Sequence, residues 1–353
     1  MKIAIDITPL SDTRILSHKV RGTGFYLEYL KRSLLKFYPE INYHFFSKGE
    51  EVPDNVDLVH YPYFETFFPT LPLFEKHKRV VTVHDLTPIV FSKNFPAGIK
   101  GNLFWQIQKW SLKNSSLIIT DSKSSKKDII KYTGINSYKI AVVYLAAGEE
   151  FNKLESGNWK KDIKTKYNLP DKFVLYVGDV TWNKNLPRLI QATQSINVPL
   201  VMVGKALVEE NFDKSNPWNQ DLVEVHRLAD TDDKISRLGF VPTEDLVALY
   251  NLATVFVMPS IYEGFGLPLV EAMKCGSPSI ATKGGSLPEV GGEAVYYVDA
   301  FDSNSIALGI EKVFTSEKLQ EELSKKGIEQ SKKFSWQETA KQTIDAYKIC
   351  LEK

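Results

Sequence analysis

Two glutamates flank a glycine-rich turn in the second half of the chain, beside a predicted anion site. The turn follows an apolar run of strand length, residues 254–258, and contains Gly264 and Gly266. A helix is predicted to begin near Pro268 and to end at Gly276. The backbone amides and the positive dipole end at the start of such a helix attract an anion such as a diphosphate.

The two glutamates occupy different places in this element. Glu271 lies about one turn inside the helix, where a carboxylate is electrostatically stabilised, so it could be purely structural. Glu263 lies in the turn at the end of a strand, and the ends of parallel strands are where open sheets bind ligands. Paired carboxylates beside an anion site suit a ligand with both phosphates and sugar hydroxyls. The alternative is two surface acids near a helix start.

Further strand ends carry side chains that could act on the same ligand. One apolar strand ends at Gly178 and is followed by a loop with Asn183 and Lys184. The lysine could reach a diphosphate as a flexible point charge, or it could be a solvated surface lysine. Another strand ends at His84, which could exchange a proton, hydrogen-bond to a hydroxyl, or serve as a buried structural histidine. A third strand-to-turn element ends at Gly204.

This arrangement resembles the signature of the retaining glycosyltransferases of family 4, which have the two-domain GT-B fold and use nucleotide-sugar donors. The resemblance rests on Glu263-x7-Glu271 in its strand, turn and helix, followed by Gly-Gly-Ser-Leu-Pro-Glu-Val at 284–290. It spans nearly the whole chain and is tightest over 239–290.

The resemblance implies a role for each matching residue. His84 and Glu263 would be catalytic, with Glu263 holding hydroxyls of the transferred sugar and His84 facing that sugar from the other domain. Glu271 would hold the ribose, while the nucleobase would meet the backbone near Val241 and pack on Leu246. The other donor-binding residues that it implies are Gly22, Gly24, Gly178, Asn183, Lys184, Gly204, Gly264, Phe265, Gly266 and Leu267.

One residue of the family pattern is missing. The family binds the diphosphate with an arginine and a lysine; Lys184 matches the lysine, but Asp179 and Asn183 stand where an arginine would be expected. Asn183 or a basic residue of the first domain could compensate. The missing charge keeps open a non-catalytic sugar-nucleotide-binding partner subunit, and a GT-B nucleotide-sugar epimerase is a further alternative. Gly22 and Gly24 are predicted to form a turn that opens an amphipathic helix. A nicotinamide oxidoreductase is disfavoured, because this Gly-x-Gly lacks the third glycine of the dinucleotide fingerprint.

Composition predicts a soluble protein with two domains. The chain has 353 residues, of which 43% are hydrophobic and 25% charged, with a net charge of +1. Near-neutral charge argues against a nucleic-acid binder. Cys275 and Cys350 form no disulfide framework, and no apolar run has the length of a membrane span or signal segment. We therefore expect a cytoplasmic protein.

The predicted fold class is α/β, namely GT-B with two doubly wound Rossmann-like domains facing a cleft. Residues 1–167 would form the acceptor domain and 168–333 the donor domain, with a helix at about 334–353 packing back on the first. Residues 92–115 mix lysines with tryptophans. They could form a basic amphipathic helix in peripheral contact with the inner face of the membrane, or an ordinary packed helix.

The sequence thus predicts a hexosyltransferase that needs no cofactor and no metal. An Asp-x-Asp at Asp230 to Asp232 lies among polar segments, where acids of solvated turns are common. The donor would be a nucleotide-diphosphate sugar with a mannosyl-, rhamnosyl- or glucosyl-type unit. The acceptor would be a hydroxyl of a saccharide or lipid-linked saccharide, in the assembly of cell-surface polysaccharide, lipopolysaccharide or glycolipid. Retention, by front-face departure and attack, follows from the resemblance.

Overall fold

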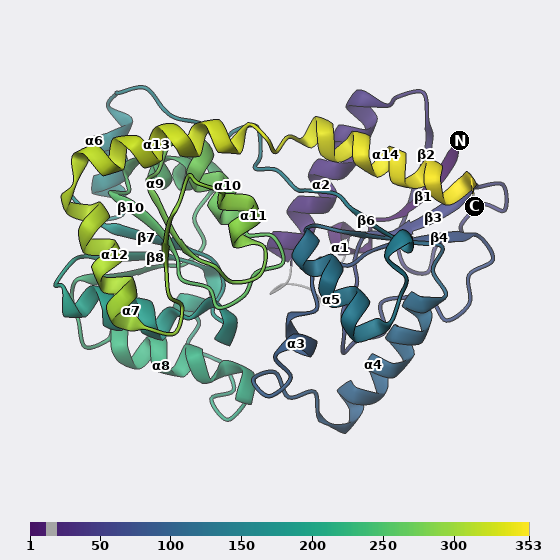
Figure 1. Ribbon diagram of the computed structural model, residues 1–353, viewed down its shortest axis with the longest axis horizontal. Helices are drawn as coiled ribbons and strands as arrows, with labels where there is room; N and C mark the ends of the chain where they lie inside the picture. The colour runs from purple at the N-terminus through teal and green to yellow at the C-terminus, as the bar shows by residue number, and fades with distance from the viewer. Residues whose placement is uncertain (12–19, 353) are drawn as a thin grey trace. The chain divides into compact units, whose positions relative to one another are not determined.

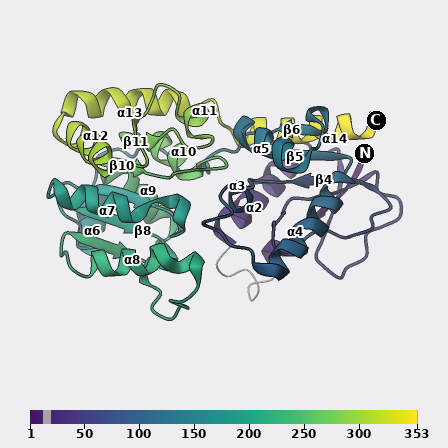
Figure 2. The ribbon, with the colours of Figure 1, turned by 60° about the horizontal axis from the view of Figure 1, so that its bottom comes forward.

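The computed structural model describes residues 1–11 and 20–352 and divides into two compact units. Unit 1 consists of Met1–Leu145 and Ser335–Lys353, so both chain ends belong to it, and unit 2 consists of Ala146–Phe334 (Figures 1 and 2). Each unit contains one six-stranded parallel sheet with helical connections. This is the layered α/β arrangement that alternating strands and helices predict.

Unit 1 has the strand order β2-β1-β3-β4-β5-β6, and every neighbouring pair is parallel. Its strands are β1 (Lys2–Asp6), β2 (Asn42–Phe46), β3 (Leu58–Tyr61), β4 (Lys78–Thr82), β5 (Leu117–Thr120) and β6 (Ile140–Val142). Its helices are α1 (Thr8–Ser11), α2 (Val20–Phe37), α3 (Thr87–Val90), α4 (Gly98–Lys113), α5 (Lys123–Thr133), the 3-10 turn η1 (Ser137–Lys139) and α14 (Trp336–Glu352). All residues of β3 and β5 are buried, as expected for strands covered on both faces.

Unit 2 has the order β12-β11-β10-β7-β8-β9, again entirely parallel. Its strands are β7 (Val174–Val177), β8 (Leu200–Val203), β9 (Ile235–Leu238), β10 (Val255–Met258), β11 (Ser279–Thr282) and β12 (Tyr296–Val298). Its helices are α6 (Trp159–Lys166), α7 (Leu186–Ser195), α8 (Gln220–Ala229), α9 (Thr243–Leu252), α10 (Leu267–Lys274), α11 (Leu287–Gly291), α12 (Ser303–Thr315) and α13 (Glu317–Ser331). The 3-10 turns are η2 (Trp182–Lys184), η3 (Lys205–Val208) and η4 (Pro217–Asn219).

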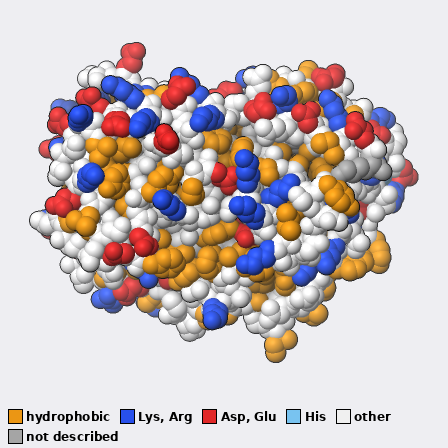
Figure 3. Space-filling view, in the orientation of Figure 1, with side chains coloured by type: hydrophobic (Ala, Val, Ile, Leu, Met, Phe, Trp, Pro, Cys, Tyr) orange, Lys and Arg blue, Asp and Glu red, His pale blue; other side chains and the backbone are white. Residues whose placement is uncertain are grey.

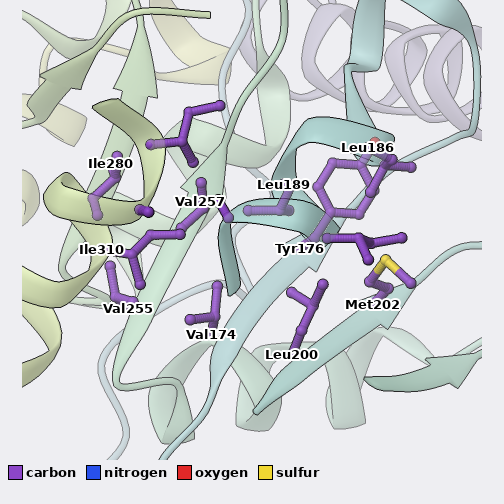
Figure 4. Close-up of a cluster of buried hydrophobic side chains, with 14 of the residues drawn as sticks. Val174, Tyr176, Leu186, Leu189, Leu200, Met202, Val255, Val257, Ile280 and Ile310 are labelled. Atoms are coloured by element: carbon purple, nitrogen blue, oxygen red, sulfur yellow. The ribbon is translucent and has the colours of Figure 1, made fainter. Parts of the chain in front are cut away.

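The core of unit 2 follows from the two-residue period of its strands. Val255 and Val257 of β10 point into a cluster with side chains of α7, α8 and α12 (Figure 4). Phe256, between them, points to the other face and packs edge-on against Tyr250 of α9, with ring centroids 5.5 Å apart. Because both faces are covered, the strand reads as a continuous apolar run.

The last helix, α14, belongs to unit 1 and packs against α2 (Figure 1). Trp336 stacks on Tyr29 of α2 at 5.1 Å, and the Thr339 hydroxyl donates to the carbonyl of Tyr144 at 2.7 Å. Tyr347 is fully buried and hydrogen-bonds to Nδ1 of His60 on β3 at 2.7 Å. The chain end is therefore an integral part of the first unit.

Unit 2 begins at Ala146, earlier than the boundary predicted after residue 167. The charged segment between these two boundaries, residues 146–167, is hydrogen-bonded to α9, so it is part of unit 2 and not a linker. The backbone amide of Leu154 donates to the Asn251 side chain at 2.8 Å, and the Tyr167 hydroxyl donates to Asp245 at 2.6 Å. Composition alone does not show such contacts.

No helix in the described part of the chain is long and apolar enough to cross a membrane.

Candidate functional site

The sheet of unit 2 reverses its strand order between β7 and β10. From β7 the chain adds β8 and β9 on one side, and from β10 it adds β11 and β12 on the other. Loops that leave the carboxyl ends of two such strands diverge and create a ligand crevice. The loop after β7 carries Lys184 and the loop after β10 carries Glu263, so both predicted residues lie at this point of the sheet.

Lys184 and Glu263 form an ion pair across the two loops. The lysine Nζ lies 2.8 Å from each carboxylate oxygen. Glu263 is buried and Lys184 is about one-fifth exposed. Two further bonds join the loops, since the Asn183 side chain donates to the carbonyl of Tyr262 at 3.0 Å and the amide of Ile261 donates to the carbonyl of Asn183 at 2.7 Å. The structure thus brings together three residues that the sequence placed at one site.

The glycine-rich turn has the backbone geometry that was predicted for it. Gly266 has a φ of +92° and precedes α10, and Pro268 lies in the first turn of that helix. A positive φ is costly for other residues, which explains glycine at this position. Gly264 and Phe265 are buried, and Leu267 begins the helix. Glu271 lies one turn inside it, as predicted.

The backbone of Glu263 is held by the motif at 284–290. The amide of Ser286 donates to the carbonyl of Glu263 at 3.0 Å, and its hydroxyl donates to that of Phe265 at 2.8 Å. Gly285 has a φ of +62°, and a Cβ there would lie 2.2 Å from the carbonyl oxygen of Glu263. The Gly-Gly-Ser sequence therefore fixes the position of the catalytic candidate.

Gly285→Ala tests this support. The new Cβ would meet backbone at 2.2 Å and would also be strained at positive φ. We expect unfolding free energy to fall by roughly 3 kcal/mol and any activity that needs Glu263 to fall with it. Gly49→Ala is the matched control, because Gly49 has a φ of +95° but a Cβ added there would have no atom within 4 Å. Equal losses in urea unfolding of the two variants would contradict the bracing role.

Glu271 has a partner that sequence reasoning missed. The Tyr250 hydroxyl of α9 donates to its carboxylate at 2.9 Å, and Tyr250 is fully buried. Burial, together with the charge of Glu271, raises the pKa of Tyr250 well above its usual range, so the phenol remains a donor. The sequence signal for this partner was a tyrosine on the apolar face of α9, the helix that precedes α10.

The other predicted donor residues of unit 2 lie at successive strand ends. Gly178 follows β7 and Gly204 follows β8, and a Cβ on Gly204 would lie 2.1 Å from the carbonyl oxygen of Gly178. The two glycines allow the loops to approach closely. Val241 is buried and Leu246 is half-buried, both beyond the end of β9.

An open pocket of about 630 Å³ lies on the β11 and β12 side of the Glu263 loop. Tyr262, Lys283, Tyr297 and Phe301 are among its lining residues, whereas Lys184 and Glu263 are not. The Tyr297 hydroxyl donates to the carbonyl of Gly292 at 2.9 Å, which holds its ring in place. There is consequently room for a ligand next to the turn.

His84 lies in unit 1, directly beyond β4. Its Nδ1 is 2.7 Å from a carboxylate oxygen of Asp121, which follows β5, and its ring meets Tyr26 of α2 edge-on at 4.8 Å. Sequence reasoning missed Asp121, although an aspartate at the end of the neighbouring strand was the available signal. Burial alone would lower the pKa of His84, but the carboxylates of Asp121, Asp85 and Glu65 together outweigh burial and raise it.

Gly22 and Gly24 also lie in unit 1, but not in the turn that was predicted. Helix α2 begins at Val20, so both glycines lie within its first turns. The amphipathic pattern that continues from Phe25 extends back through them. They share this helix with Tyr26, the aromatic neighbour of His84.

In the described residues no three histidine, cysteine, aspartate or glutamate side chains cluster as a metal site would require. Asp230 of the Asp-x-Asp sequence pairs instead with Arg237, at 2.5 Å.

Comparison with known proteins gives a consistent family assignment. The profile "Glycosyltransferase Family 4" matches residues 9–147, and "Glycosyl transferases group 1" matches residues 158–330. The serotype-specific mannosyltransferase WbdA of Escherichia coli is 32% identical over 286 residues, which are 78% of this chain and 34% of WbdA. This chain therefore spans about a third of that relative's length. The E. coli O-antigen chain mannosyltransferase B is 31% identical over 280 residues, 77% of this chain and 70% of the relative.

Solved structures show the same fold at lower identity. Sucrose-phosphate synthase from Thermosynechococcus elongatus superimposes with a TM-score of 0.77 at 19% identity, covering 99% of this chain and 98% of that one. Anabaena HepE, solved with UDP-glucose, superimposes with a TM-score of 0.73 at 18% identity, and the match covers 99% of both chains. From these matches and its two parallel six-stranded sheets, the chain belongs to glycosyltransferase family 4 and has the GT-B fold.

Proposed function

We propose that this chain is a retaining hexosyltransferase that takes a sugar from a nucleotide-diphosphate donor and attaches it to a hydroxyl of a saccharide acceptor. The observation that carries the proposal is the Lys184–Glu263 pair at the β7–β10 switch point. One side chain suits phosphate and the other suits sugar hydroxyls. A mannosyl donor for polysaccharide assembly is the first to test, because WbdA and mannosyltransferase B are mannosyltransferases.

The proposed reaction separates charge at the diphosphate. The bond between the anomeric carbon and the β-phosphate oxygen breaks, and a bond to the acceptor oxygen forms on the same face of the sugar. The acceptor proton passes to the departing phosphate oxygen. Lys184 stabilises the developing negative charge as a flexible point charge close to the phosphate. The start of α10 adds its positive dipole end.

The remaining groups hold the donor. Glu263 accepts hydrogen bonds from hydroxyls of the transferred sugar, and Glu271, oriented by Tyr250, accepts them from the ribose. The nucleobase lies toward Val241 and Leu246, and His84 hydrogen-bonds to a sugar hydroxyl. No cofactor or metal takes part in this scheme.

A panel of nucleotide-sugars tests the proposal. GDP-mannose, UDP-glucose and dTDP-rhamnose are each added to the protein in thermal unfolding, where a ligand at 100 times its dissociation constant stabilises by about 2.7 kcal/mol. The stabilising donor is then incubated with mannose oligosaccharides in EDTA, and product is detected by mass spectrometry. Transfer with retention supports the proposal. Donor conversion without acceptor indicates an epimerase, and binding without any turnover indicates a partner subunit.

The acceptor side includes a surface on α4 that fits an anionic membrane. Ile99, Leu103 and Trp110 are 93%, 60% and 49% exposed, and their spacing puts them on one stripe of the helix. Exposed Lys100 and Lys113 lie on the same helix. Figure 3 shows hydrophobic and basic side chains side by side over the part of unit 1 where Figure 1 places α4. Trp105, by contrast, is buried and packs in the unit's interior.

Replacing both Ile99 and Leu103 with glutamate is expected to weaken binding to phosphatidylglycerol vesicles about tenfold or more, because each apolar contact is lost and each new charge is repelled. Co-sedimentation with the vesicles measures the binding of each variant. Leu35→Glu and Leu308→Glu, at exposed leucines of α2 and α12, are the controls. Equal binding by all variants, or none by the wild type, would show that α4 is an ordinary packed helix.

A further inference from the structure

The pairing of His84 with Asp121 is built into the sheet of unit 1. The two residues lie beyond the carboxyl ends of β4 and β5, which are adjacent strands, and Nδ1 of His84 lies 2.7 Å from Oδ2 of Asp121. The Asp121 side chain is only 3% exposed. A carboxylate that deeply buried is costly unless it is paired and hydrogen-bonded. The histidine supplies that compensation.

The ring of His84 is also held by packing. Tyr26 lies edge-on to it, at 4.8 Å between centroids and 86° between planes. The Tyr26 hydroxyl is bonded to Thr82 at 3.1 Å, and Thr82 is bonded to Nε2 of His60 at 2.8 Å. This buried network fixes the position of Tyr26. Because Tyr26 packs against the imidazole of His84, that imidazole has little freedom to rotate away from Asp121.

The far nitrogen of His84 is left for another partner. Its Nε2 is buried and makes no hydrogen bond with any residue that the structure describes, and the same is true of Oδ1 of Asp121. A buried polar atom without a partner costs free energy. A hydroxyl bound beside His84 would remove that cost, which makes Nε2 the ligand-facing atom of the ring.

We propose that Asp121 is a positioning residue, which fixes the ring of His84 through Nδ1 so that Nε2 donates a hydrogen bond to an oxygen of a sugar bound beside the carboxyl end of β4. This role rests on the proposed function. Asp121 acts through His84 and does not itself touch the sugar. Its negative charge favours the imidazolium form of the ring, in which Nδ1–H bonds to Asp121 and Nε2 also carries a proton to donate.

The other carboxylates around His84, like that of Asp121, favour the protonated ring. Besides Asp121 from β5, the groups facing it are Asp85 in its own loop, Glu65 from the loop after β3, and His60 on β3, whose ring is neutral. The three carboxylates oppose the effect of burial, and they raise the pKa of His84. Nε2 therefore keeps its proton further into the neutral range.

The test compares Asp121→Asn and Asp121→Ala with Asp85→Asn. Asparagine keeps the shape of the side chain without its charge, and Asp85→Asn removes a nearby carboxylate that caps the amide of Thr87 at 2.7 Å and does not bond to the ring. The 15N-labelled imidazoles are titrated by NMR in the ligand-free protein. His84→Gln identifies the His84 signal among the 6 histidines. We expect the pKa of His84 to fall by about one unit in both Asp121 variants, and by less in Asp85→Asn.

Steady-state kinetics give the second readout. If the pKa of His84 falls by one unit, the fraction of His84 that is protonated drops about tenfold at a pH above the pKa of both proteins. At a pH below both of these pKa values the fraction hardly changes. The kcat of Asp121→Asn should therefore drop about tenfold at pH 8.5 and recover towards wild type at pH 5.5, with KM less affected. Thermal unfolding confirms that the variant is folded. An unchanged pKa of His84 in both Asp121 variants, or a kcat loss independent of pH, would overturn the proposal. Because the titration needs no donor, a wild type that transfers no sugar would instead overturn the proposed function.

Discussion

Lys184→Met is expected to lower kcat/KM for sugar transfer about 100-fold to 1000-fold, mostly through kcat. In the proposed reaction the lysine charge lies where the departing diphosphate gains charge, and removal of one such donor costs that much in enzymes that stabilise an anionic group. Methionine keeps the length and apolar stem of the side chain but not its charge. Kinetics with the donor found in the ligand panel measure the effect.

The same substitution should also destabilise unit 2. It leaves the carboxylate of Glu263 buried without the partner that lies 2.8 Å away. Unpaired buried charges are strongly destabilising, and since Lys184 is about one-fifth exposed we expect a loss of roughly 2 kcal/mol in urea unfolding.

A double-mutant cycle separates these two effects. Glu263→Gln combined with Lys184→Met removes both charges, so we expect most of the stability to return while transfer stays at or below the rate of Lys184→Met. Lys205→Met is the control for the loss of a lysine, because Lys205 is exposed on the neighbouring loop after β8. If the double variant regains activity together with stability, or if Lys205→Met is equally inactive, the assignment of Lys184 to the diphosphate is wrong.

His60 is expected to give the protein a marked loss of stability in mild acid. The ring is fully buried between Tyr347 of α14 and Thr82 of β4, and burial lowers its pKa to about 3. The unfolded chain binds a proton near pH 6.5, whereas the folded chain does not. The stability from this group is thus complete above pH 6.5 and is lost as the pH falls toward 3. Between pH 7.5 and 4.5 the loss amounts to roughly 2–3 kcal/mol.

His60→Asn should flatten that pH dependence. The variant is less stable at pH 7.5, because two buried hydrogen bonds are changed, but its unfolding free energy should fall less on acidification. Urea unfolding at pH 7.5, 6 and 4.5 measures the slope in each protein. His44→Asn on the edge strand β2 is the control for the loss of a histidine. Parallel slopes for wild type and His60→Asn would show that His60 is not neutral in the folded state.

The local elements were predictable from the sequence because their signals are local. The apolar run before Pro259, the glycines of the turn and the proline that follows them specified a strand, a turn and a helix, and β10 and α10 confirm these. Period-two burial and glycine conformation depend on a few neighbouring residues, so one stretch of chain determines them. The family resemblance rested on the same stretch, and the comparisons confirm it.

The partners across the chain were decided only by the tertiary structure. Lys184 and Glu263 are 79 residues apart and meet because β7 and β10 are neighbours at the point where strand order reverses. His84 meets Asp121, and His60 meets Tyr347, for similar reasons of strand and helix order. A sequence shows which residue types stand at strand ends. Which ends are adjacent, and so which charges compensate one another when buried, depends on how the sheet is assembled.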